Sequence, residues 1–132
     1  METFEIRTHE RNCFVEITSQ VSEVVHKHGL ADGLCVVYCP HTTAAITINE
    51  NADPDVVHDM LLWFDRTIPY RQPDFRHGEG NSDSHIKASL VGSSATVIVD
   101  KGKLVLGRWQ GVYFCEFDGP RTRRVLVKVT GK

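Results

Sequence analysis

The sequence predicts one α+β domain over residues 1–132, with a largely antiparallel sheet arrangement and three helices. Short apolar segments, either alternating or continuous, indicate strands, and three other segments carry helix start and stop signals. Turn-forming residues separate the strands at short intervals, which favours antiparallel pairing. The predicted element order is ββαββααββββ, and 132 residues are enough to bury one ordinary hydrophobic core.

The first part of the chain is predicted to hold four strands and one helix. The strands are expected at residues 3–8, 14–17, 34–39 and 44–49. The helix is expected to be capped by Thr18 or Ser19 and to end before Gly29, since glycine commonly terminates helices. Its inward positions recur at helical spacing: Val21, Val24, Val25 and His28.

Two further helices are expected in the middle of the chain. Asp53-Pro54-Asp55 predicts a helix start, because it offers a capping carboxylate, a proline at the first helical position and an acid in the first turn. The apolar stripe expected to be buried is Val57, Met60, Leu61 and Phe64. After a polar loop over 70–82, a short helix is expected to start at Ser82 or Asp83 and stop at Gly92, with Ile86 and Leu90 facing inward. The last four strands are expected at 95–99, 104–106, 112–117 and 125–129.

Charge and composition exclude several functions. Fifteen basic against seventeen acidic residues give a net charge of −2, which argues against broad binding of nucleic acid or anionic membranes. No segment has the roughly 18 apolar residues of a membrane span, and the N-terminal residues do not resemble a signal peptide. We therefore expect a cytoplasmic protein in a reducing compartment. The cysteines are expected to be unpaired: Cys13, Cys35, Cys39 and Cys115.

Three of the seven histidines stand out because they lie at element ends or in the long loop. These are His41, His77 and His85, whereas His9, His26, His28 and His58 are expected to be solvated on the surface. Three neutral imidazoles are a common ligand set for catalytic zinc. Their spacing matches no fixed zinc signature, so loop histidines that only form hydrogen bonds are the competing interpretation.

A glycine-containing segment leads into the third predicted helix. Gly78 and Gly80 let the backbone approach a ligand, and the free N–H groups near Asn81 favour an anion such as phosphate. The segment matches neither the P-loop spacing nor G-x-G-x-x-G. A flexible surface turn is an equally good interpretation. Lys87, one helical turn further on, either reaches the same anion or is solvated.

Other candidates lie at turns. Glu50 or Asp53 is a candidate general base or further ligand, although Asp53 is also an excellent helix cap. Arg121 follows a turn that begins with Asp118, and a carboxylate that holds an arginine prepares it for phosphate or carboxylate binding. Arg123 and Arg124 are expected to be surface charges. Gln110 contributes both a donor and an acceptor.

Three blocks of the sequence resemble the YjbQ-like family of small proteins. They are the segment CPHTTAAITINENADPDV from Cys39 to Val56, the segment HGEGNSDSHIKASL from His77 to Leu90, and the segment GRWQGVYFCEFDGPR from Gly107 to Arg121. The blocks occur in the family's order and cover nearly the whole chain. The resemblance implies a compact α+β domain with two packed sheets, assembled as a homotrimer.

The resemblance also implies a function and a site. Members of the family are associated with a weak, secondary thiamine-phosphate synthase activity, in which a pyrimidine diphosphate joins a thiazole phosphate and diphosphate leaves. A divalent metal, zinc or magnesium, is expected near His41, His77 and His85. The residues that match the family blocks and are expected to form the pocket wall are Glu50, Asp53, Lys87, Gln110, Asp118 and Arg121.

The sequence thus supports an enzyme acting on the phosphate ester or diphosphate of a small molecule, with metal assistance at a histidine-lined pocket. The expected partners are a phosphorylated substrate and further copies of the chain, with no nucleic acid and no membrane. The alternative is a non-catalytic trimeric protein that binds a metal or a phosphorylated metabolite. A structural trimer whose polar loops serve assembly is a third interpretation.

Overall fold

The computed structural model describes residues 1–132 and confirms the α+β class and the predicted element order. The strands are β1 (Glu2–Arg7), β2 (Cys13–Glu16), β3 (Asp32–Tyr38), β4 (Ala44–Glu50), β5 (Ser94–Asp100), β6 (Lys103–Leu104), β7 (Gln110–Glu116) and β8 (Thr122–Gly131). The helices are α1 (Thr18–Lys27), α2 (Pro54–Thr67) and α3 (Ser82–Val91). β8 is longer than the predicted 125–129, because it pairs with β1 along one edge and β3 along the other.

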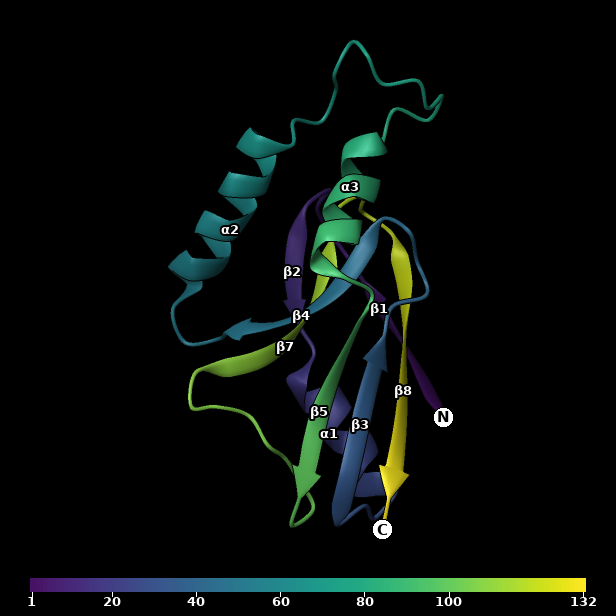
Figure 1. Ribbon diagram of the computed structural model, residues 1–132, viewed down its shortest axis with the longest axis vertical. Helices are drawn as coiled ribbons and strands as arrows, with labels where there is room; N and C mark the ends of the chain where they lie inside the picture. The colour runs from purple at the N-terminus through teal and green to yellow at the C-terminus, as the bar shows by residue number, and fades with distance from the viewer.

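The strands form two antiparallel sheets. The larger has the order β1-β8-β3-β5-β6 and the smaller has the order β2-β7-β4. In Figure 1 the long strands β3, β5 and β8 run side by side, with α1 behind them and the smaller sheet above. The smaller sheet is buried on both faces at its central strand: Val112 and Phe114 face one cluster of apolar side chains, and Tyr113 and Cys115 face another.

The main core lies where α1 and the two sheets meet. Val21, Val24 and Val25 of α1 are buried in it, as their spacing predicted, whereas His28 at the helix end is exposed. Gly29 follows with a φ of 61°, a conformation that stops the helix at little cost only for glycine. Thr18 does not cap α1; its hydroxyl instead accepts a hydrogen bond from the Val112 amide and ties the helix to β7.

The second helix begins as predicted but is placed differently. Asp53 is its N-cap and accepts a hydrogen bond from the Asp55 amide at 2.9 Å. No residue of α2 is fully buried, but the four residues of its predicted apolar stripe are half-buried, and Val57 and Phe64 pack against the smaller core cluster. Figure 1 shows α2 standing to one side of the sheets, joined by one loop to β4 and by a longer one to α3. The spacing of its apolar residues makes the helix amphipathic. The tertiary arrangement then leaves its apolar face half-exposed.

The third helix also turns an unexpected face inward. Ile86 and Leu90 are 39% and 65% exposed, which contradicts their predicted inward orientation. The buried side chains of α3 are instead Asp83, Ser84, Lys87 and Ala88. The N-cap position is Asn81 rather than Ser82 or Asp83, and its side chain does not cap the helix. A polar face is buried because it meets polar partners from two other segments: Arg11 contacts Asp83 and Ser84, and the Phe117 carbonyl accepts from Ser84.

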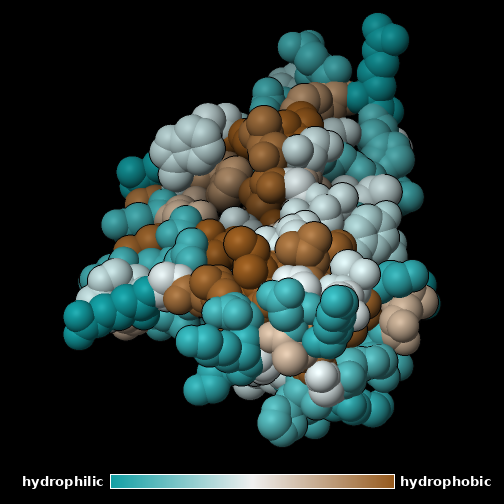
Figure 2. All heavy atoms as spheres, turned by 60° about the horizontal axis from the view of Figure 1, so that its bottom comes forward, coloured by the Kyte–Doolittle hydropathy of each residue, from teal (hydrophilic) through white to brown (hydrophobic).

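Two surface features complete the fold. Exposed apolar side chains, among them Leu34, Ile98, Trp63 and Trp109, occur on the larger sheet, on α2 and on the loop before β7. Figure 2 shows apolar side chains gathered across the middle of one face and bordered by hydrophilic ones. The four cysteines are free, as predicted, and three of them are buried. None of the three helices combines the length and apolar character needed to cross a bilayer.

Candidate functional site

A polar cavity of about 440 Å³ opens at the N-terminal end of α3. It is formed where the loop after β3, the loop before α3 and the turn between β7 and β8 come together. None of its eleven lining residues is hydrophobic: Pro40, His41, Thr42, Thr43, His77, Glu79, Asn81, His85, Asp118, Arg121 and Arg123. The structure therefore brings the three predicted histidines together with Asn81 and Arg121, from three separate parts of the sequence.

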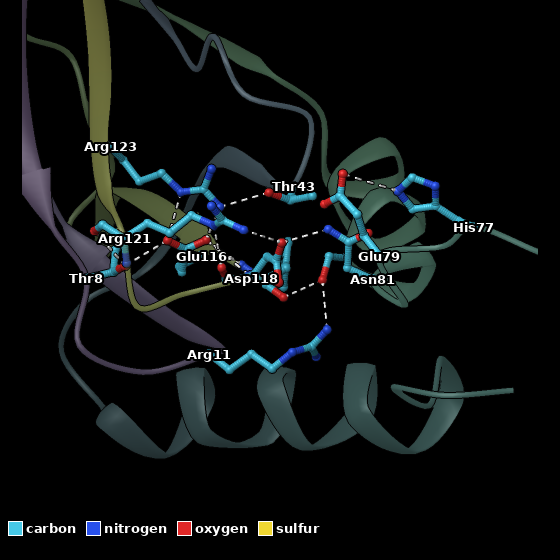
Figure 3. A network of polar contacts seen from close by, with 12 residues as sticks. Thr8, Arg11, Thr43, His77, Glu79, Asn81, Glu116, Asp118, Arg121 and Arg123 are labelled. Carbon is cyan, nitrogen blue, oxygen red and sulfur yellow. Dashed lines mark hydrogen bonds and ion pairs between the residues drawn. The ribbon is translucent and has the colours of Figure 1, made fainter. Parts of the chain in front are cut away.

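A buried ion pair forms the floor of this cavity. Glu116 is fully buried and Arg123 is 5% exposed, which corrects the prediction of Arg123 as a surface charge. The guanidinium Nε donates to Glu116 Oε1 at 2.8 Å, and Nη2 donates to Thr43 Oγ1 at 2.8 Å (Figure 3). Thr8 donates to the same carboxylate at 2.7 Å. Every charge has partners, which is the condition under which a buried pair is tolerated.

Arg121 is held at the rim of the cavity, as its sequence position predicted. Its Nε donates to the Asp118 carbonyl at 2.9 Å, and its Nη2 donates to Asp118 Oδ2 at 3.2 Å. Asn81 donates to that same carboxylate oxygen at 2.8 Å (Figure 3). Half of the Arg121 side chain remains exposed, so its other N–H groups are free to meet a bound anion.

His41 is held in one orientation and one protonation state. Its Nε2 accepts a hydrogen bond from the Arg124 amide at 2.9 Å, which places the proton of the neutral ring on Nδ1. Burial lowers the pKa of His41, and the nearby positive charge of Arg123 lowers it further. The ring is therefore neutral at neutral pH.

The other two histidines face each other. The rings of His77 and His85 have centroids 5.5 Å apart and meet edge to face. Glu79 Oε1 lies 3.9 Å from His77 Nε2, so a carboxylate stands beside the pair (Figure 3). The His77 side chain is 45% exposed and so remains accessible to a ligand.

The fit of a divalent metal to these residues is partial. Two imidazoles on one zinc ion have ring centroids about 5–6 Å apart, given Zn–N bonds of roughly 2.1 Å, and His77 and His85 match that separation. His41 does not complete the set, because its Nε2 lone pair is engaged by the Arg124 amide. No group of three or more His, Cys, Asp or Glu side chains in the structure is arranged to hold an ion.

Lys87 lies beneath the cavity and does not line it. The side chain is 1% exposed, and its Nζ donates to Asp83 Oδ2 at 2.8 Å. Arg11 binds the same carboxylate through two N–H groups, each at 3.0 Å, and stacks on the ring of Tyr70. Burial alone would raise the pKa of Asp83, but the hydrogen bonds from Arg11 and Lys87 hold it below its ordinary value. The structure thus places Lys87 in a buried ion pair and outside the cavity lining.

Several predicted site residues lie outside the cavity. Glu50 accepts a hydrogen bond from the Asp53 amide at 3.2 Å, so both serve the start of α2. Gln110 accepts from the Gly107 amide at 2.7 Å and closes the turn before β7. Gly78 and Gly80 are absent from the lining, and the Gly80 amide already donates to the His77 carbonyl. These contacts engage polar groups that the sequence analysis proposed for catalysis or ligand binding.

Sequence reasoning missed four polar residues of this region: Arg11, Thr43, Glu79 and Glu116. Glu116 carried a usable signal, because it is an acid within the apolar segment 112–117 and so needs a buried cationic partner. Glu79 lies two residues from His77 in a loop, where spacing fixes no orientation. Arg11 and Thr43 carried no local signal, because their partners are 72 and 80 residues away.

The fold and the cavity define a class: a small two-sheet α+β domain with a polar pocket rich in histidine and arginine. A family model described as UPF0047 protein YjbQ-like matches residues 2–132. The chain therefore belongs to the YjbQ-like UPF0047 family.

Relatives and solved structures agree with this assignment. The chain is 51% identical to the UPF0047 protein YugU of Bacillus subtilis over 131 residues, covering 99% of each chain. It is 50% identical to a UPF0047 protein of Methanocaldococcus jannaschii, covering 97% of this chain and 92% of the relative. A crystal structure of an uncharacterized YjbQ/UPF0047 protein from Clostridium acetobutylicum has a TM-score of 0.96 at 52% identity, with 98% of this chain and 100% of that chain covered.

Proposed function

We propose that this protein is an enzyme that acts on phosphate esters or diphosphates of small molecules at the polar cavity. One observation supports this most: a cavity without hydrophobic lining combines two arginines with three histidines. Arginine binds phosphate through paired N–H groups, and histidine exchanges protons near neutral pH. Breaking a bond to phosphate needs both charge neutralisation and proton transfer.

The residues divide these tasks by their surroundings. Arg121 is fixed by Asp118 and half-exposed, so it binds the phosphate oxygens. His77 and His85 are the proton-transfer groups, because both line the cavity and Glu79 stands beside them. Arg123 forms the floor, where Glu116 balances its charge and, with Thr43, holds the guanidinium in place.

A divalent metal, zinc or magnesium, is proposed as an additional component. His77 and His85 would hold it, and it would supply polarisation of the phosphate when bound. His41 joins them only if its hydrogen bond with the Arg124 amide is given up. The role assigned to Arg121 does not depend on the metal. An imidazole nitrogen that coordinates a metal cannot accept a proton, so proton transfer by His77 and His85 applies to the metal-free site.

The thiamine-phosphate synthase reaction implied by the family resemblance belongs to this reaction class, because diphosphate is its leaving group. We propose it as a secondary activity of the same cavity. A homotrimer and a cytoplasmic location are proposed with it. The exposed apolar side chains of α2 support an assembly of several chains, since apolar surface of this kind is typically covered by a partner.

The test is turnover of a panel of phosphate esters and thiamine precursors by untagged protein. Replacing His77 by alanine is expected to reduce turnover about 100-fold or more, the range for loss of a proton-transfer group. His58→Ala is the matched control, because the His58 side chain is 70% exposed on α2 and does not line the cavity. Elemental analysis of the same three proteins tests the metal, whose content is expected to fall in His77→Ala alone.

The alternative function is a non-catalytic protein that binds a metal or a phosphorylated metabolite. It predicts ligand binding that His77→Ala weakens, without turnover of any panel member by the wild type. Equal turnover by wild type and His77→Ala would contradict the enzyme at this cavity. A structural trimer would instead lose assembly when His41 or His85 is replaced by alanine.

A further inference from the structure

The histidine-lined cavity has a neighbour on the other side of two of its histidines. A second cavity of about 460 Å³ lies along α3 and the junction between α3 and β5. It shares His41, Thr42 and His85 with the first cavity. The two spaces therefore meet at these three residues, and a ligand that passes His41 and His85 has access to both.

The two cavities differ in chemistry. The first is lined by polar side chains and by charges of both signs: Arg121 and Arg123 with the carboxylates of Glu79 and Asp118, of which Asp118 is already engaged by Arg121 and Asn81. Apart from the shared residues, the second is lined by Ala44, Ala88, Ser89, Gly92 and Ser93, so it contributes hydroxyl groups and small apolar surfaces but no arginine, lysine or carboxylate. The first suits an anionic group, and the second suits an uncharged group that forms hydrogen bonds.

The walls of the second cavity are held in place before any ligand arrives. The Ile46 amide donates to the Gly92 carbonyl at 3.0 Å, and the Cys39 amide donates to the Ser93 carbonyl at 2.8 Å. No atom lies within 4 Å of the position a Cβ would take at Gly92, so the open space reaches the backbone. A preformed wall of this kind avoids the entropy cost of ordering a loop on binding.

We propose that the two cavities form one two-lobed substrate site. The first, the phosphate lobe, binds the phosphate group, and the second, the body lobe, holds an uncharged, hydroxyl-bearing body of the same molecule. The substrate class is thus the phosphate ester of a small polyol or sugar, extended across His41 and His85. This inference rests on the proposed function and adds to it the part of the substrate that is not phosphate. Ser89 and Ser93 become specificity-determining residues.

The test fills the body lobe and leaves the phosphate lobe intact. Ser89 is exposed and lines only the second cavity, so Ser89→Trp places an indole there without disturbing the core. Leu90→Trp is the matched control, because Leu90 is the next residue of α3, is 65% exposed and lines neither cavity. Inorganic phosphate and ribose 5-phosphate are the two probes, and isothermal titration calorimetry gives their Kd for each protein.

If the body lobe holds part of the substrate, Ser89→Trp should lose affinity for ribose 5-phosphate and keep its affinity for inorganic phosphate. Inorganic phosphate is expected to bind all three proteins within about twofold, whereas ribose 5-phosphate is expected to bind wild type and Leu90→Trp more tightly than Ser89→Trp, by about tenfold or more. Unchanged ribose 5-phosphate affinity in Ser89→Trp would overturn the body lobe and leave the phosphate site standing. Equal weakening of both probes would overturn the separation into two lobes.

Two further outcomes concern the wild type. Ribose 5-phosphate that binds no more tightly than inorganic phosphate would overturn the assignment of a hydroxyl-bearing body. Failure of wild type to bind either probe would overturn the phosphate lobe, and with it both the proposed function and this inference.

Discussion

Single residues in this protein take their roles from their partners more than from their type. Lys87 and Arg121 are both cations near the start of α3, yet Lys87 is buried against Asp83 while Arg121 stays half-exposed at the rim. Arg123 and Arg124 are adjacent in sequence, yet one side chain pairs with buried Glu116 and the other residue contributes its amide to His41. The alternation of a strand sends neighbours to opposite faces, which separates such pairs.

His41 provides a prediction at this scale. Its pKa is lowered in the folded state, first by burial and then by Arg123, so the unfolded chain takes up a proton there more readily than the folded one. The His41 contribution to stability is therefore complete above about pH 6.5 and is lost as the pH falls toward the lower folded pKa. The free energy of unfolding is measured with urea at pH 7.5 and at pH 5.5. It is expected to fall less between these two pH values for His41→Asn than for wild type. His58→Asn is the control, and its free energy of unfolding should fall as much as that of wild type. An identical fall in all three proteins would contradict the role of His41 in this pH dependence.

Glycine packing adds a constraint at the same scale. A Cβ at Gly111 would lie 2.8 Å from Asn51 Nδ2 and 2.8 Å from Glu16 Oε2, which are hydrogen-bonded to each other. A Cβ at Gly119 would lie 2.2 Å from the Glu10 carbonyl oxygen. Both separations are far below van der Waals contact, so these two glycines of the third family block are required by close packing.

Among the elements, α2 begins where its sequence predicts, whereas α3 buries a different face from the one its sequence predicts. The start of α2 follows its local signal, with Asp53 as the cap and Pro54 first in the helix. In α3 the local apolar residues Ile86 and Leu90 remain exposed, and a polar face is buried against Arg11. A helix is formed by local spacing, whereas its buried face depends on what the rest of the chain presents to it.

The contacts of Asp53 and Glu50 at the start of α2 lead to a prediction for this helix. Asp53→Ala is expected to lower the free energy of unfolding by about 1 kcal/mol, the usual loss of a helix cap. Turnover should be unchanged, because Asp53 caps α2 and does not line the cavity. Denaturant unfolding and steady-state kinetics measure the two effects. A large loss of turnover with unchanged stability would support Asp53 as a candidate base. Asp55→Ala is the control, because it also removes one negative charge from the start of α2 but keeps the Asp53 cap.

At the scale of the whole molecule, the exposed face of α2 is the feature that a single chain leaves unexplained. Val56, Met60, Trp63 and Phe64 line an apolar hollow of about 400 Å³ on this helix, and Trp63 is 57% exposed. Val57 and Phe64 attach α2 to the smaller core cluster, but none of its 14 residues is fully buried in one chain. Contact with a second chain would bury it, in keeping with the proposed homotrimer.

Sedimentation equilibrium tests this assembly. A chain of 14.9 kDa is expected to run as a trimer of about 45 kDa. Trp63→Arg is expected to shift the population toward the monomer with unchanged circular dichroism, since it places a charge on the apolar face. His58→Arg, on the exposed side of the same helix, should remain trimeric. A monomeric wild type would refute the trimer, and a trimeric Trp63→Arg protein would remove α2 from its interface.

By itself, the sequence determined the fold class, the order of strands and helices, the start of α2, the end of α1 at Gly29 and the three histidines that line one cavity. Each of these follows from periodicity, from capping and turn residues or from family blocks read along the chain. Only the tertiary structure decided that Lys87, Glu50 and Gln110 serve structural contacts, and that Arg123, Glu116 and Glu79 belong to the site. The physical reason is distance in sequence. A polar side chain's role is fixed by partners far along the chain, 108 residues away for Thr8 with Glu116, and no local pattern records which partner folding will supply.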